Sequence, residues 1–204
     1  MTTSNQKNIP ALRFKEFDGE WEVKKLGEAC NIIGGGTPET SKEEYWNGNI
    51  QWYTPTEIKR KYLSTSKRRI TDLGLKKSSA KLLPRGTLLL CTRATIAELS
   101  IAVEECTTNQ GFQSLIVKSD SVNEFIYYWI LNNKKEFVKR ASGSTFLEIS
   151  KKEIQKIKIK LPELKEQQKI AHFLSQLDEQ IQQTRQQLAH LQDYKKGLLQ
   201  QLFV

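Results

Sequence analysis

The C-terminal part of the chain carries apolar residues spaced alternately four and three positions apart. The repeat runs through Ile170, Leu174, Leu177, Ile181, Thr184, Leu188, Leu191, Lys195, Leu198 and Leu202, of which only Thr184 and Lys195 are not apolar. Such a heptad pattern predicts a helix whose apolar seam pairs with a second helix. We expect a helix of roughly 33 residues, about 50 Å long at about 1.5 Å per residue. A rod of this length suits a protein that holds two copies of a unit a fixed distance apart.

The two polar seam residues indicate how such helices pair. In a parallel, in-register pair Lys195 would face Lys195, and like charges in a desolvated seam are costly. In an antiparallel pair Lys195 lies opposite Leu177 and Thr184 opposite Leu188, and a lone lysine can reach toward acids such as Asp178. We therefore expect a homodimer through antiparallel C-terminal helices, with contacts made by Ile170, Leu174, Leu177, Ile181, Leu188, Leu191, Leu198 and Leu202.

The first 162 residues have the pattern of a globular domain of mixed α and β structure, the α+β class. Apolar runs at 86–91, 100–103 and 113–117 predict strands, and the spacing of aromatic residues over 122–138 predicts a helix. Apolar residues at 157, 159 and 161 alternate with lysines, which is typical of a strand with one buried face. Pro162 suits the first position of a helix, with Glu163 and Glu166 in its first turn. We therefore expect a domain over 1–162 and a long coiled-coil helix over 163–204.

The basic charge is concentrated in the globular part. The chain has a formal net charge of +9, yet bases and acids are equal in number from residue 163 onward. Residues 56–85 hold ten bases against only Glu57 and Asp72. A basic globule suits a polyanionic partner, because cations that neutralise phosphates release condensed counterions. A run such as 67–69 can equally be a solvated face.

Composition also limits the class of protein. No apolar run approaches the roughly 20 residues that cross a bilayer, so we expect a cytoplasmic protein with no membrane partner. Cys30, Cys91 and Cys106 are odd in number and include no C-x-x-C pair. This favours reduced cysteines partly within the core over a disulfide framework or a zinc site.

Patterns typical of catalysis are missing. His172 and His190 fall on the outer face of the predicted helix, which leaves no histidine in the globule for a catalytic triad or a metal site. The glycine-rich run at 34–38 lacks the motifs of phosphate-binding loops, and Pro38 removes a backbone N–H. A tight turn or a recognition loop is the better interpretation. We expect no catalytic residue, no metal ligand and no cofactor in this chain.

Three segments combine bases, amides, hydroxyls and aromatic rings, namely 34–52, 54–69, and 93–95 together with 109–113. Arginine reads guanine and glutamine reads adenine in the major groove, whereas lysine and hydroxyl groups mainly hold phosphates. The residues that we expect to contact DNA are Thr37, Lys42, Lys59, Arg60, Arg93, Gln110 and Ser144.

Structural roles compete with this interpretation. Trp46, Trp52 and Phe112 fit a core better than a base-stacking role. Arg93 has an alternative as a buried partner of Glu98 or Glu104. The hydroxyl-rich segment 142–145 is either a phosphate-binding loop or a simple turn.

The same segments, in this order, resemble the specificity subunits of type I restriction–modification enzymes. The most telling match is 141–146 followed by 148–151; the others are Trp21, 25–28, 35–38, 45–48, 50, 52, 54–55, 86–89, 93–96, 109–112, 161–162, 166–167, 169–171 and 196–200. The resemblance covers nearly the whole chain. One departure is Ala97, where the family more often has a glycine.

The resemblance implies a target-recognition domain that reads about half of a bipartite DNA site, followed by a long helix. It implies double-stranded DNA, methyltransferase subunits and restriction subunits as partners, with S-adenosylmethionine, ATP and Mg²⁺ bound by those subunits. A usual specificity subunit has two such units, so this chain is similar to a half-subunit or to an excised half, and the resemblance then implies that two copies are needed. A non-catalytic specificity subunit is therefore the expected function, and a coiled-coil architectural protein that binds nucleic acid without sequence preference is the alternative.

Overall fold

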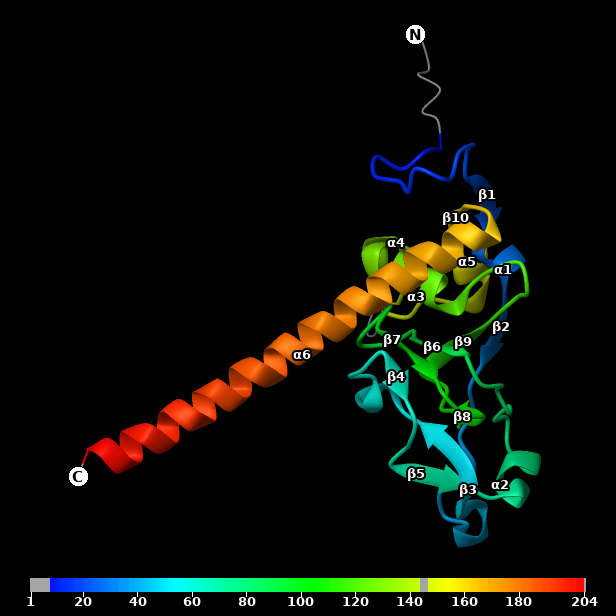
Figure 1. Cartoon of the computed structure of the whole chain (residues 1–204). Coiled ribbons are helices and arrows are strands. Elements are labelled where there is room, and N and C mark those ends of the chain that lie inside the picture. Colours follow the sequence, from blue (N-terminus) through cyan, green and yellow to red (C-terminus); the bar gives the residue numbers. More distant parts are fainter. Residues whose placement is uncertain (1–7, 144–146, 204) are drawn as a thin grey trace.

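The computed structural model describes residues 8–143 and 147–203, and Figure 1 shows a globular domain from which one long helix projects. The strands are β1 (Glu22–Lys25), β2 (Cys30–Gly34), β3 (Trp46–Tyr53), β4 (Tyr62–Leu63), β5 (Arg68–Ile70), β6 (Leu88–Cys91), β7 (Leu99–Ala102), β8 (Cys106–Thr108), β9 (Phe112–Val117) and β10 (Lys158–Leu161). The helices are α1 (Leu26–Ala29), α2 (Asp72–Lys76), α3 (Asn123–Asn132), α4 (Lys134–Lys139), α5 (Lys151–Lys156) and α6 (Leu164–Leu202), with short 3₁₀ turns η1 (Glu43–Tyr45) and η2 (Pro55–Glu57). The fold is the expected α+β class.

A five-stranded sheet lies at the centre of the domain. Its strand order is β2-β9-β6-β7-β4, with all neighbours antiparallel except β4 and β7, which are parallel. A second sheet, β5-β3-β8, lies at the end of the domain distant from the N-terminus, and β1 pairs with β10 near the base of α6 (Figure 1).

The central sheet is buried on both faces, which explains the continuous apolar run of β6. Leu88 and Leu90 face the largest core cluster, which includes residues of α1, α3, α4, α5 and α6. Leu89 and Cys91 belong to a separate cluster on the opposite face. Successive side chains of a strand point to opposite faces, so a strand covered on both sides is apolar throughout. The strands predicted at 86–91, 100–103, 113–117 and 157–161 are all present.

The aromatic residues and cysteines lie in the interior. Trp46 and Trp52 of β3 are buried in a third cluster with Ile70 of β5, and Phe112 is buried at the start of β9 in the central sheet. Their core interpretation is confirmed. All three cysteines are free and fully buried, rather than only partly within the core.

The helix predicted over 122–138 is two helices. Asn133, between α3 and α4, has φ −113° and ψ 21°, which is not helical. Its side-chain amide donates to the carbonyl oxygen of Trp129 at 2.8 Å, and asparagine competes with helix in this way. The change of direction places Phe137 of α4 in the core, fully buried.

The long helix is longer than predicted and begins slightly later. It has 39 residues, or about 58 Å at about 1.5 Å per residue, instead of roughly 33 residues. Glu163 is its N-cap, so the prediction that Pro162 occupies the first helical position is wrong. The extra length arises because the first turns pack on the domain: Gln167 and Ala171 are buried, and Ile170 packs against the main core.

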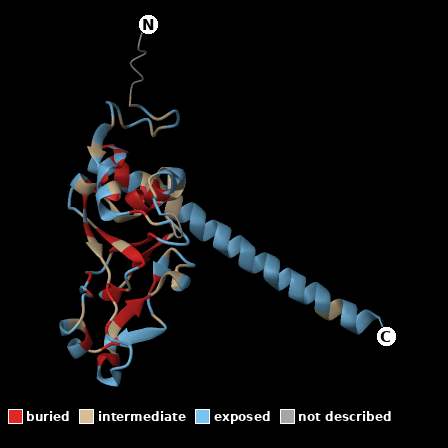
Figure 2. Cartoon of the chain, turned by 180° about the vertical axis from the view of Figure 1, so that it is seen from behind, coloured by how far each residue is buried: buried red, intermediate tan, exposed pale blue. Residues whose placement is uncertain are grey.

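The remainder of α6 stands away from the domain, as Figures 1 and 2 show from opposite sides. Most apolar seam residues along it are exposed, from 38% at Leu177 and 55% at Leu188 to 69% at Leu202, whereas Leu174 and Leu198 are half-buried. Ile170, predicted as a dimer contact, instead packs against its own domain. Both histidines lie on the exposed surface of α6. Among the described residues, none of the helices has the length and hydropathy that crossing a membrane requires.

Candidate nucleic-acid interface

The glycine-rich segment after β2 is a loop held close to the domain. The backbone N–H of Gly36 donates to the carbonyl oxygen of Thr108 at 2.8 Å, and the indole N–H of Trp52 donates to the carbonyl oxygen of Gly36 at 2.9 Å. A Cβ on Gly36 would overlap Ser79 and Ala80, so only glycine fits here. The buried tryptophan thus fixes the position of the loop that carries Thr37.

Thr37 and Gln110, two predicted contact residues, meet although they are 73 positions apart. The hydroxyl of Thr37 donates to Oε1 of Gln110 at 2.6 Å. Gln110 is exposed, at the turn that precedes β9. This contact orients an exposed amide, the type of group that reads an adenine edge.

Arg93 lies at the same end of the central sheet. The N–H of Thr92 donates to the carbonyl oxygen of Gly111 at 2.9 Å, so Arg93 and Gln110 are next to a shared backbone hydrogen bond. Arg93 pairs with Glu148, with 2.9 Å between Nε and Oε2, and its side chain is 48% exposed. The alternative that Arg93 is a buried partner of Glu98 or Glu104 is wrong, because Arg93 pairs with Glu148 and Glu98 pairs with Lys134, at 2.6 Å.

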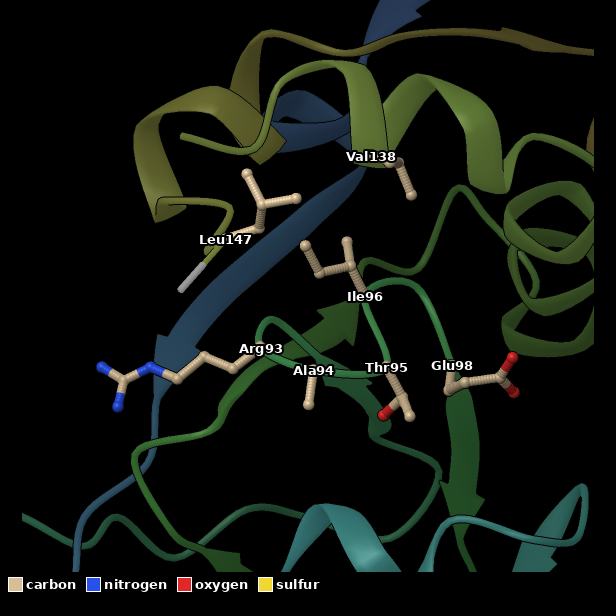
Figure 3. A pocket seen from close by; sticks show the side chains of 7 residues that line it. All are labelled: Arg93, Ala94, Thr95, Ile96, Glu98, Val138 and Leu147. Atoms are coloured by element: carbon tan, nitrogen blue, oxygen red, sulfur yellow. The ribbon is translucent and has the colours of Figure 1, made fainter. Parts of the chain in front are cut away.

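A hollow of about 570 Å³ lies beside Arg93 (Figure 3). Ile96, Val138 and Leu147 converge on it from the β6–β7 loop, α4 and the segment before α5, and Arg93 extends away from its rim. The loop is tightly bent, with φ values of 51° at Ala94 and 65° at Ala97. Glycine favours this left-handed region, so both alanines are strained in this loop. Ser144, another residue that we expect to contact DNA, lies outside the described residues.

Lys59 and Arg60 lie on a separate basic loop at the β4 edge of the central sheet, and both are exposed. The carboxylate of Glu57 closes this loop: it accepts from the N–H of Lys67 at 2.7 Å and from the N–H of Thr54 at 2.8 Å. A shallow hollow of about 250 Å³ is lined by Thr56, Glu57, Lys59, Arg60, Tyr62, Leu63, Ser64, Thr65 and Lys67. The loop presents cations and hydroxyl groups, the groups that hold phosphates.

Lys42 lies near the second sheet, 3.7 Å from Glu39 and 5.5 Å from the centre of the Tyr45 ring. Sequence reasoning missed Arg68, which belongs to this sheet. The guanidinium carbon of Arg68 lies 3.4 Å from the centre of the Trp46 ring and 5.6 Å from that of Trp52. Stacking on an indole orients a guanidinium group and leaves its N–H groups free to donate to a phosphate or a base. The alternation of Arg68 with Ile70 indicates a strand. It does not reveal the contact of Arg68 with Trp46, because that contact depends on the pairing of β5 with β3.

The structure therefore brings Thr37, Gln110 and Arg93 to one end of the central sheet, and places Lys59 and Arg60 on a loop at its edge. Lys42 belongs with the second sheet. Within 8–143 and 147–203 no three His, Cys, Asp or Glu side chains cluster as metal ligands would.

Comparison with known proteins gives matches that span nearly the whole chain. Residues 18–193 match the model of the family "Type I restriction modification DNA specificity domain". The specificity subunit of the type I restriction enzyme MjaIX from Methanocaldococcus jannaschii is 37% identical over 201 residues, covering 94% of this chain and 46% of that protein. The EcoR124I/EcoR124II specificity subunit from Escherichia coli is 31% identical, covering 82% of this chain and 43% of that protein.

Solved structures show the same fold. A chain from a study of assembly and conformational transition of the type I R-M system matches with a TM-score of 0.70 and 24% identity, over 90% of this chain and 45% of that chain. The HsdS subunit from Thermoanaerobacter tengcongensis matches with a TM-score of 0.64 and 23% identity, over 84% of this chain and 41% of that one. The present chain thus spans somewhat less than half the length of these relatives.

Proposed function

Since the chain belongs to the family of type I restriction–modification DNA specificity domains, we propose that it reads one half of a bipartite DNA site. The observation that carries the proposal is the extent of the family match, residues 18–193, which includes both the globular reader and most of the rod. The globular domain supports it, because the exposed groups of Arg93, Gln110 and Lys59 lie on loops that adjoin the strands of a buried sheet.

The contact residues divide by chemistry. Gln110 and Arg93, at the end of the central sheet, are suited to base edges, and Thr37 orients Gln110. Lys42, Lys59 and Arg60 are suited to phosphates. Ser144 is proposed as a phosphate contact from its sequence alone.

The partners that we propose are methyltransferase and restriction subunits. The chain itself is non-catalytic in this account, and S-adenosylmethionine, ATP and Mg²⁺ belong to those partners. Its place of action is the cytoplasm, where the DNA substrate lies.

We propose further that two copies pair through antiparallel rods. The exposed apolar side chains of α6 from Leu177 to Leu202 support this, because an unpaired seam of this length is unfavourable in water. Ile170 is left out of the pairing, since it packs on its own domain.

Cysteine cross-linking tests the orientation. In the double variant Leu177→Cys/Lys195→Cys, antiparallel pairing joins position 177 of one copy to position 195 of the other. The single variant Lys195→Cys is the control, because it cross-links only in a parallel pair. A dimer from the single variant, or a monomeric wild-type chain in sedimentation, contradicts the antiparallel homodimer.

Footprinting tests the DNA function. The assembly with its methyltransferase is expected to protect two short elements separated by an unprotected gap. The architectural alternative predicts uniform protection, with an affinity that falls steeply with salt on any sequence.

A further inference from the structure

Among the described residues, Lys61 makes the side-chain contacts with α6 that lie farthest along this helix toward its C-terminus. Nearer its N-terminus α6 is fastened by Gln167, whose amide oxygen accepts from the N–H of Val122 at 3.0 Å, and by buried Ala171. The final contacts are made by Ser175 and Asp178. Beyond them every residue over 179–196 is exposed.

The ammonium group of Lys61 binds both sides of this junction. It donates to the hydroxyl of Tyr128 on α3 and to the hydroxyl of Ser175 on α6, each at 2.7 Å. Asp178 completes the link: it accepts from Tyr128 at 2.5 Å and lies 3.9 Å from the ammonium group. The ammonium group of Lys61 therefore links the loop before β4 to both α3 and α6.

Aromatic rings surround the same group. The ammonium nitrogen lies 4.5 Å from the centre of the Tyr128 ring, 5.1 Å from that of Tyr62 and 5.7 Å from that of Tyr127. The Lys61 side chain is only 14% exposed. Burial lowers the pKa of this amine, while the nearby acids, Asp178 foremost, act in the opposite direction. A lysine side chain with these contacts is held in one position, unlike a lysine on the open surface.

The backbone of Lys61 belongs to the loop that carries two of the proposed DNA contacts. Its carbonyl oxygen accepts from the N–H of Ile101 at 2.7 Å, and the carbonyl oxygen of Arg60 accepts from the hydroxyl of Ser100 at 2.6 Å. The loop is thus bonded to β7, with Lys59 and Arg60 exposed beside it. One residue connects the sheet, the proposed phosphate-binding loop and the rod.

Small movements at this junction become large at the end of the rod. Residues beyond Asp178 extend for about 36 Å at about 1.5 Å per residue. A tilt of about 10° displaces the tip by about 6 Å, close to two base pairs at about 3.4 Å each. The contact farthest from the anchored end of a lever restrains its angle most effectively.

We propose that Lys61 is a positioning residue that fixes the direction of α6 relative to the globular domain. In a pair of chains it thereby sets the distance between the two DNA half-sites that the protein accepts. The second part rests on the proposed function, and the first does not. Lys61 acts through Ser175 and Tyr128, without touching DNA.

Distance measurements on the full-length chain test the first part. Spin labels at the exposed positions Ser119 and Gln192 report the angle between domain and rod, with labelled chains diluted by unlabelled ones. Lys61→Met keeps the apolar stem and removes the cation, and Tyr128→Phe removes only a hydroxyl group. Both variants are expected to broaden the distance distribution roughly twofold, whereas the matched control Lys59→Met leaves it unchanged. Distributions as narrow as wild type in both folded variants would overturn the proposal.

Binding to DNA with varied spacers tests the second part. Wild type is expected to lose affinity when the spacer between half-sites changes by one or two base pairs, whereas Lys61→Met accepts these spacers with nearly equal affinity. Lys59→Met is expected to weaken binding at every spacer without changing the preference. An unchanged spacer preference in Lys61→Met rejects the role in spacing. A wild-type protein that binds no DNA rejects the proposed function, and the distance measurement then still decides whether Lys61 fixes the rod.

Discussion

Arg13 and Glu166 form a two-pronged ion pair across 153 positions of sequence. Nε of Arg13 donates to Oε1 of Glu166 at 2.8 Å, and Nη2 donates to Oε2 at 2.7 Å. The Glu166 side chain is fully buried at the base of the rod. The N-terminal segment is thereby fastened across the first turn of α6, beside the edge-on contact of Phe14 with Phe173.

Replacing Glu166 tests this fastening. Glu166→Gln is expected to lower the melting temperature by several degrees, because the Arg13 guanidinium loses its charged partner in a largely buried place. Glu179→Gln, an exposed acid on the same helix, is the control and should leave stability unchanged. Equal melting temperatures for the two variants would show that the pair contributes nothing to stability.

The loop of Lys59 and Arg60 predicts a specific salt dependence. If each side chain neutralises one phosphate, Lys59→Ala and Arg60→Ala each reduce the slope of log affinity against log salt by about 0.9. Lys118→Ala is the matched control, since Lys118 is exposed at the opposite end of β9 from Gln110. Identical slopes for all three variants and wild type would remove the loop from the DNA interface.

The strained β6–β7 loop predicts a stabilising substitution. Ala94 is exposed with φ 51°, so Ala94→Gly is expected to raise the free energy of unfolding by about 0.5–1 kcal/mol through release of strain. Ala97, with φ 65°, is fully buried, and its glycine variant should gain less because a packed methyl group is lost. Denaturant unfolding of both variants checks the order, and a destabilised Ala94→Gly would contradict it.

The cysteines predict how stability varies at alkaline pH. Burial raises the pKa of the Cys30 and Cys106 thiols to about 12 and that of Cys91 to about 11. The unfolded thiols ionise with a pKa of about 8.5, whereas the folded ones stay protonated, so their contribution to stability declines as pH rises above about 8.5. Native protein at a pH of about 8 should also resist a thiol reagent until denaturant is added. Rapid labelling without denaturant would contradict the burial of these thiols.

Patterns with a short period predicted much of the fold. The heptads predicted the long helix, and the alternation at Ile157, Ile159 and Leu161 predicted β10, because each pattern repeats with the period of one type of element. The break at Asn133 was missed, since a single residue between two apolar stretches gives no change of period.

The site was less accessible to such reasoning. Residue type alone suggested Thr37 and Gln110, but their contact depends on how the chain folds over the 73 positions that separate them. The same holds for Arg68 on Trp46 and for Lys61 against Ser175. These contacts join elements that are distant in sequence, and no local pattern encodes their pairing.

Selection of bound duplexes from random DNA tests the central claim most directly. The protein assembled with its methyltransferase is expected to enrich one short element, an unread spacer of fixed length, and the same element inverted, because two-fold pairing of identical readers produces a palindromic bipartite site. Recovery of DNA without any shared element, or of a single uninterrupted site, would contradict the account.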